Sequence, residues 1–157
     1  MKICDILSVE RIKPELDSET KNDIINELID LLKDNEQIKD LETVKSAVLE
    51  REKIMSTGVG KGFAIPHAKT PAVQKIVACF GKTKQPVDFE ALDGEPVNLI
   101  FVLVGQDNMV GPHIKLLSRI SRMMSKDEFR EAIAEAKTAE EIYNLFDEEE
   151  KKYFEMT

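Results

Sequence analysis

Apolar residues recur at spacings of three and four in the N-terminal part of the chain, the spacing of one face of a helix. The segment from Asp17 to Asn35 carries such a stripe, made of Ile24, Ile25, Leu28, Ile29, Leu31 and Leu32. Asp17 and Ser18 precede the stripe and are candidate N-terminal caps. The same spacing predicts a second helix from Asp40 to about Lys53, capped by Asp40. Each helix therefore has one face that packs against a core.

The last third of the chain has the same helical pattern. Gly111 and Pro112 open a predicted helix that runs to Met124, since proline is favoured in a first helical turn. Two shorter helices are also predicted, at residues 126–136 and 138–146. Their candidate caps are Ser125 and Thr138, respectively. Residues 147–157 follow as an acidic tail that either continues the last helix or frays. Its acidic cluster is predicted to be a solvated face.

Runs of apolar residues predict strands between the helices. Val97–Val104 is the most apolar segment and is predicted to be a buried central strand. Gln74–Lys84 predicts another strand and Phe63–Ile65 a short one, whereas Pro86–Asp93 is a loop or a short edge strand. The glycine-rich segment Ser56–Gly62 is predicted to lack regular structure. Because helices and strands alternate, we expect the 157 residues to form a single α/β domain around four or five short strands.

Composition narrows the classes of partner. Lys and Arg number 22 and Asp and Glu 30, which gives a formal net charge of −8. Nucleic acids and anionic membranes bind basic faces, so neither is expected as a partner, whereas basic proteins and small ligands stay open. The longest apolar run, Leu99–Val104, is far too short to insert into a membrane. Cys4 and Cys79 match no metal-binding spacing and favour a reducing, cytoplasmic setting.

The candidate site is a glycine-spaced segment within residues 51–68, and it matches neither common nucleotide-binding loop. Gly81-Lys82-Thr83 ends like a P-loop, but Ile76 stands where the first glycine belongs. The dinucleotide fingerprint needs a third glycine where Phe63 stands. Both nucleotide-binding interpretations are therefore excluded.

His67 is the candidate nucleophile of this segment. Pro66 precedes it and has a fixed backbone angle, so His67 leaves the chain in a defined direction. Histidine is mostly neutral at pH 7, and a neutral imidazole nitrogen can attack phosphorus. Arg51 offers a bidentate donor to a phosphate, and the intervening loop offers hydroxyls and backbone amides. The candidate phosphate-binding residues of that loop are Ser56, Thr57, Gly58 and Gly60.

His113, the second of the two histidines, lies near the predicted start of the helix 112–124, where anions are favoured. If the fold places it beside His67, the pair could share a phosphate, although spacing along the chain does not show that they meet. Structural alternatives stay open for all these residues. Both histidines could be ordinary loop or core residues, Arg51 could complement the helix dipole, and the loop could be only a tight connection.

The residues in question resemble the signature of a known family. That signature belongs to the fructose/mannitol-type (type 2) enzyme IIA domain of the bacterial phosphoenolpyruvate-dependent phosphotransferase system, and nitrogen-regulatory enzyme IIA proteins share it. The similar segments are Arg51-Glu52, Ser56-Thr57-Gly58-Val59-Gly60 and Ala64-Ile65-Pro66-His67-Ala68. Residues 86–97 resemble the family's middle segment, and His113 with Leu116-Leu117-Ser118 resembles the start of a family helix. The resemblance covers nearly the whole chain.

The resemblance implies a mixed sheet of about five strands flanked by helices on both faces. It implies that His67 accepts a phosphoryl group from the phosphocarrier protein HPr, which presents basic residues, and passes it to a IIB domain for sugar uptake. It also implies that His113 and Arg51 assist at the phosphate. The loop Gly105–Gly111 lacks the proline that many members have before the second histidine.

Two alternatives to sugar transport stay open. Phosphorylation of His67 could be a switch that controls docking to a target protein, as in a regulatory enzyme IIA. A metal site built from His67 and His113 is the weaker alternative, because two histidines with no clear carboxylate in the motif provide too few ligands for a metal ion. We therefore expect neither a metal nor a cofactor.

Overall fold

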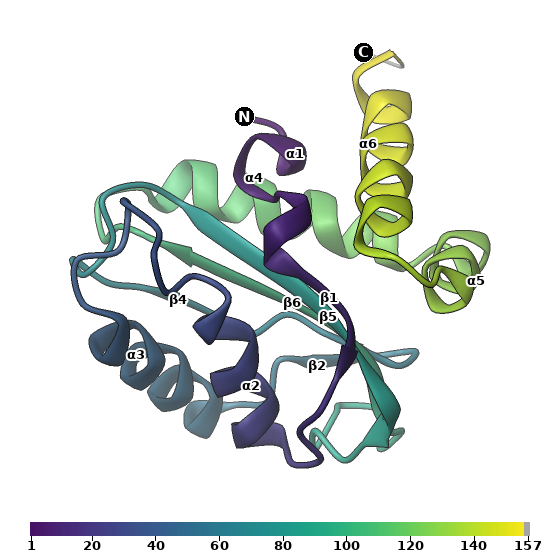
Figure 1. The fold of residues 1–157 in the computed structure, drawn as a ribbon, viewed down its shortest axis with the longest axis horizontal. Coiled ribbons are helices and arrows are strands. Elements are labelled where there is room, and N and C mark those ends of the chain that lie inside the picture. The colour runs from purple at the N-terminus through teal and green to yellow at the C-terminus, as the bar shows by residue number, and fades with distance from the viewer. Residues whose placement is uncertain (156–157) are drawn as a thin grey trace.

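The computed structural model describes residues 1–155, which form helices packed on a mixed sheet (Figure 1). The helices are α1 (Ile3–Ile6), α2 (Lys21–Asp30), α3 (Leu41–Ile54), α4 (Val110–Met124), α5 (Asp127–Glu135) and α6 (Ala139–Glu155), with a 3-10 turn η1 at Val9–Arg11. The strands are β1 (Ile12–Leu16), β2 (Gly58–Gly60), β3 (Phe63–Ala64), β4 (His67–Lys69), β5 (Val77–Val87) and β6 (Val97–Gly105). Within the described residues, no helix has the length and apolar character needed to cross a membrane.

The sheet is mixed, as predicted, and β5 and β6 form its antiparallel centre. β1 runs parallel to β5, while β2 runs antiparallel to β3. The strand order is β1-β5-β6-β3-β2, with β4 also beside β6. β3 and β4 both run parallel to β6, with β3 beside Leu99 and Ile100 and β4 beside Leu103–Gly105. β4 therefore lies at the C-terminal end of β6, next to the connection that leads into α4.

Helices cover both faces of the sheet, which confirms the predicted architecture. α2 and α3 lie on one face, and α1, α4, α5 and α6 lie on the other (Figure 1). Successive residues of a strand point to opposite faces, so Phe101 joins one core cluster and Val102 the other. Phe101 packs edge-on against Phe146 of α6, with ring centres 5.7 Å apart. β6 is thus buried on both faces, which explains its continuous apolar sequence.

The start of α2 corrects one sequence prediction. Thr20, rather than Asp17 or Ser18, is the cap, because its hydroxyl accepts a hydrogen bond from the amide of Asp23 at 3.3 Å. The amides of Asp17 and Ser18 donate instead to the carboxylate of Glu27, at 2.9 and 2.8 Å. This contact with α2 holds the two residues in the connection before the helix. α2 is consequently shorter than the predicted segment.

The other predicted caps have mixed outcomes. Asp40 caps α3 as predicted, and its carboxylate accepts from the amide of Glu42 at 3.2 Å. The Thr138 hydroxyl likewise accepts from the amide of Glu141 at 3.2 Å at the start of α6. Ser125 does not cap α5, because it ends α4 and its hydroxyl donates back into that helix. The N-terminus of α5 has no side-chain cap.

Short strands are where the sequence prediction was least complete. Residues 56–62, predicted to be irregular, contain β2, in which Gly60 has a φ of 108° that favours glycine. β1 was not predicted and includes Pro14, which is tolerated because β1 is an edge strand. β4, also missed, is only three residues long. β5 extends past the predicted boundary through Pro86.

The acidic tail is helical up to residue 155, where it continues α6, and the last two residues lie outside the described part of the chain. The predicted solvated face is wrong for Glu149 and Glu150, which are 7% and 1% exposed. The carboxylate of Glu150 accepts hydrogen bonds from the amides of Ile3 at 2.5 Å and Cys4 at 3.2 Å. Contact with α1, which local sequence does not reveal, therefore buries Glu150.

Candidate active site

Arg51, His67 and His113 line one cavity of about 690 Å³. They lie in the last turn of α3, at the first residue of β4 and near the start of α4. Because β4 pairs with the end of β6 and α4 begins shortly after that end, His67 and His113 become neighbours. The fold thus brings together three of the predicted site residues.

The lining of this cavity suits an anionic group. Its basic members are Arg51, Lys53 and Lys69, and its carboxylates are Glu50 and Asp107. Exposed apolar side chains, among them those of Ile54 and Ile114, lie at the same cavity. In residues 1–155, no three His, Cys, Asp or Glu side chains gather where they could hold a metal ion.

The imidazole of His67 is held in one orientation by a backbone carbonyl. Its Nδ1 lies 2.7 Å from the carbonyl oxygen of Ile65. A carbonyl oxygen can only accept, so Nδ1 carries the proton and Nε2 keeps its lone pair. The next carbonyl, of Pro66, accepts from the amide of Leu103 at 3.0 Å and anchors this turn to β6. His67 therefore keeps an unprotonated Nε2 with a free lone pair.

Burial keeps His67 neutral. The half-buried ring has a pKa below its ordinary value, mainly because burial penalises the charged form. The nearby Arg51 charge lowers this pKa further, whereas the bond to Ile65 and the Glu52 charge oppose the shift. A pKa below 6.5 leaves the ring mostly unprotonated at pH 7, as a nucleophile requires.

His113 is a buried, uncharged neighbour of His67. It is 3% exposed, and within the described residues neither ring nitrogen has a hydrogen-bond partner. Burial, followed by the charges of His67 and Lys69, lowers its pKa to about 4. Gly105 makes room for the ring, because a Cβ added there would lie 3.0 Å from Nδ1 of His113. Both ring nitrogens are thus buried beside the cavity without a hydrogen-bond partner among the described residues.

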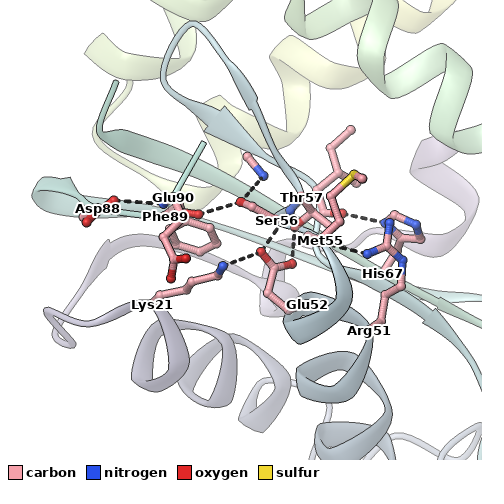
Figure 2. Close-up of polar contacts among 12 residues, drawn as sticks. Lys21, Arg51, Glu52, Met55, Ser56, Thr57, His67, Asp88, Phe89 and Glu90 are labelled. Carbon is pink, nitrogen blue, oxygen red and sulfur yellow. Dashed lines mark hydrogen bonds and ion pairs between the residues drawn. The ribbon is translucent and has the colours of Figure 1, made fainter. Parts of the chain in front are cut away.

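Arg51 supplies a positive charge next to His67 (Figure 2). Its Nη1 donates to the carbonyl of Met55 at 3.0 Å, which holds the side chain across the end of α3. The remaining guanidinium N–H groups can donate to phosphoryl oxygens. Arg51 thus has both a structural contact and a place at the cavity.

The loop residues Ser56, Thr57, Gly58 and Gly60 are not among the residues that line this cavity. The Ser56 hydroxyl donates to the carbonyl of Phe89 at 2.5 Å, and the amide of Gly58 donates back to it at 3.1 Å. A Cβ on Gly58 would lie 2.8 Å from that of Ala91, so this glycine permits close packing. The phosphate-binding role of the four residues stays a prediction.

Sequence reasoning assigned no role to Glu52, which is 5% exposed. Its carboxylate accepts from the amide of Thr57 at 2.9 Å and from its hydroxyl at 2.5 Å, and pairs with Lys21 at 2.8 Å. A signal was present, because Glu52 follows Val44 and Val48 at the four-residue spacing of the buried stripe of α3. A carboxylate in a core stripe needs polar partners.

Comparison with known proteins identifies the same family that the sequence motifs resemble, along most of the chain. A family model described as "Phosphoenolpyruvate-dependent sugar phosphotransferase system, EIIA 2" matches residues 5–149. The fructose-specific EIIABC component of Bacillus subtilis is 35% identical over 151 residues, which are 96% of this chain and 24% of that protein. The chain therefore spans about a quarter of that relative. A nitrogen regulatory protein of Bradyrhizobium diazoefficiens is 34% identical over 149 residues, 92% of this chain and 94% of that protein.

Solved structures share the fold. Nitrogen regulatory protein IIA-Ntr of Neisseria meningitidis superposes with a TM-score of 0.86 at 33% identity, covering 92% of this chain and 98% of that one. The mannitol enzyme IIA of Escherichia coli, solved in complex with its phosphorylated enzyme IIB, has a TM-score of 0.77 at 19% identity, covering 90% and 99%. The chain belongs to the EIIA 2 family of the phosphoenolpyruvate-dependent sugar phosphotransferase system.

Proposed function

We propose that this chain accepts a phosphoryl group from phospho-HPr on Nε2 of His67 and passes it to a IIB partner. The observation that carries the proposal is the 2.7 Å contact between Nδ1 of His67 and the Ile65 carbonyl. It places the proton on Nδ1 and leaves the lone pair on Nε2, in a residue that lines the cavity with Arg51 and His113. Family membership supports the same chemistry, since these domains are phosphotransferase components.

The transfer is a displacement between two imidazoles. The lone pair of Nε2 of His67 forms a P–N bond while the donor's P–N bond breaks, and that electron pair returns to the donor ring. His67 keeps its Nδ1 proton, so its ring gains positive charge and donates a stronger hydrogen bond to Ile65. Arg51 and Lys69 stabilise the negative phosphoryl oxygens. His113, which is neutral, can donate a ring N–H to the same oxygens.

The onward step to a IIB domain is part of the proposal. The mannitol enzyme IIA structure with its phosphorylated IIB supports a partner of this kind. We place residues 1–157 in the cytoplasm as one enzyme IIA domain. The thiols of Cys4 and Cys79 are both free, which fits a reducing compartment.

Incubation of the pure protein with phosphoenolpyruvate, enzyme I and HPr tests the proposal. The expected product gains one phosphoryl group, as a phosphoramidate on His67 that is labile in acid and stable in base. His67→Ala should remain unlabelled. Mapping the phosphate to Ser56, Thr57 or His113, or full labelling of His67→Ala, would contradict the assignment.

A regulatory role is the second candidate, and the nitrogen regulatory relatives favour it. In that role the same phosphorylation of His67 controls docking to a target protein. Phosphoryl transfer from the labelled protein to a IIB domain distinguishes the two. Rapid loss of label to IIB supports transport, whereas retained label with phosphorylation-dependent capture of a target supports regulation.

A further inference from the structure

We propose that Glu52 is a positioning residue for His67. The Glu52 carboxylate holds Thr57, and the backbone carbonyl of Thr57 in turn accepts from the amide of Ile65, the residue whose carbonyl contacts the His67 ring. Its effect on the rate of phosphorylation rests on the proposed function, whereas its effect on the His67 ring does not. No contact between Glu52 and the reacting atoms is required.

Arg51 and Glu52 are adjacent but face different parts of the site. Successive residues of a helix point about 100° apart, so the two side chains leave the last turn of α3 in different directions. Figure 2 shows Arg51 beside His67, while Glu52 points toward Thr57 and Lys21. In the last turn of α3, Arg51 therefore lines the cavity, whereas Glu52 binds the loop at Thr57.

The Glu52 carboxylate is fully engaged by the loop and by α2. Its Oε1 accepts from the amide of Thr57 and lies 2.8 Å from Nζ of Lys21, and its Oε2 accepts from the Thr57 hydroxyl. Burying a carboxylate costs free energy unless donors replace water, and these three donors do so. Lys21 also lies 5.5 Å from the ring centre of Phe89, whose carbonyl accepts from Ser56. Ser56 and Thr57, which connect α3 to β2, are therefore both held by hydrogen bonds.

Thr57 connects this carboxylate to His67 through the backbone. Its carbonyl accepts from the amide of Ile65 at 3.0 Å, and the carbonyl of Ile65 contacts Nδ1 of His67 at 2.7 Å. The segment between β3 and β4 is also anchored to β6, because the carbonyl of Pro66 accepts from the amide of Leu103. The acceptor that sets the His67 tautomer is thus held between α3 and the central strand.

Glu52→Gln removes the charge and one of the two acceptors while keeping the shape. The freed loop should hold Ile65 less firmly, so a larger share of His67 should carry its proton on Nε2, where it blocks attack. Imidazole ¹⁵N shifts measure this share in the unphosphorylated protein, which has two histidines. We expect an increased Nε2–H share and an initial phosphorylation rate lowered by about 10-fold. Glu42→Gln, in the exposed first turn of α3, is the matched control and should change neither.

Thr57 variants keep the proposal testable if Glu52→Gln does not fold. Thr57→Val removes the hydroxyl that Glu52 accepts from and should shift the tautomer in the same direction, whereas Thr57→Ser should shift it less. An unchanged His67 tautomer in folded Glu52→Gln, or in Thr57→Val, overturns the proposal. A wild-type protein that HPr does not phosphorylate refutes the proposed function alone, because the tautomer shift is measured without phosphate.

Discussion

The rings of His67 and His113 lie with their centres 5.8 Å apart and their planes tilted by 52°. Burial lowers the pKa of both rings, and the charge of His67 also lowers that of His113. The two rings are therefore uncharged together at neutral pH, and neither repels the approach of a positively charged residue from a partner. This arrangement is compatible with the proposed attack by Nε2 of His67 and with a neutral His113 beside it.

The low pKa of His113 predicts a loss of stability in mild acid. The native ring binds a proton near pH 4, but in the unfolded chain it does so near the ordinary value of 6.5. Between these values the unfolded state binds more protons, so the free energy of unfolding falls as the pH falls. From about pH 7 to about pH 5 the contribution of His113 is about 2 kcal/mol.

Urea unfolding at both pH values, in wild type and His113→Gln, measures this contribution. The variant should lose about 2 kcal/mol less than wild type over the same interval. Groups that do not interact with His113 titrate in both proteins and cancel in the comparison, whereas the measured difference includes the coupling of His113 to His67. Equal losses in the two proteins would show that His113 titrates normally.

Arg51→Lys should slow phosphorylation while leaving the fold intact. Lysine keeps the charge but not the planar fork of donors, so the phosphoryl oxygens lose a bidentate partner. We expect a rate lowered by about 10-fold and a free energy of unfolding changed by at most about 0.5 kcal/mol. Stopped-flow phosphorylation and urea unfolding check the two parts. Arg122→Lys, the same change at an exposed position of α4, is the control. A wild-type phosphorylation rate in Arg51→Lys would show that the guanidinium of Arg51 does not assist phosphoryl transfer.

The sequence predicted long elements better than short ones, for a physical reason. β6 and α3 carry their own signals, namely a continuous apolar run and a capped stripe. β4 has three residues and no pattern of its own, and pairing with β6 alone makes it a strand. Likewise, nothing within the acidic tail marks Glu150 as buried, because its donors come from α1 at the other end of the chain and from Arg119 of α4.

The site could be predicted as a set of residues but not as an arrangement. Residue types indicated His67, Arg51 and His113, and the fold supplies their shared cavity through β4 and α4. The hydroxyls of Ser56 and Thr57 looked free for a phosphate, yet Phe89 and Glu52 accept from them. Phe89 is distant in sequence, so that competition became visible only in three dimensions.

Glu150→Gln should destabilise the protein strongly. Its carboxylate accepts from the amides of Ile3 and Cys4 and lies 3.3 Å from Nη1 of Arg119. Loss of the charge weakens these contacts at a residue that is 1% exposed. We expect a loss of about 2–4 kcal/mol in the free energy of unfolding, measured in urea. Glu148→Gln, an exposed neighbour in α6, should stay within about 0.5 kcal/mol; an equal effect would contradict the prediction.

An exposed apolar surface next to the cavity is the expected docking face for the phosphoryl donor. Ile54, Met55 and Ile114 are 81%, 60% and 56% exposed. Ile54 and Ile114 line the cavity that contains His67, and Glu90 lines a neighbouring hollow with Ile54 and Met55. The carboxylate of Asp93 accepts from the amide of Lys61, which follows β2. The exposed apolar side chains and the carboxylate of Glu90 therefore lie in the same region, which Lys53 also lines.

The net charge of −8 predicts that salt slows association with a basic donor. Opposite fields speed encounter, and salt screens them over about 8 Å at physiological ionic strength. The association rate constant should fall several-fold between low salt and about 0.5 M salt, while the dissociation rate constant changes less because apolar contacts are barely screened. Ile54→Ser removes apolar contact and should therefore raise the dissociation rate constant. The salt dependence of the association rate constant should stay as in wild type. Stopped-flow transfer across a salt series measures both, and an association rate that stays flat or rises with salt rules out electrostatic steering.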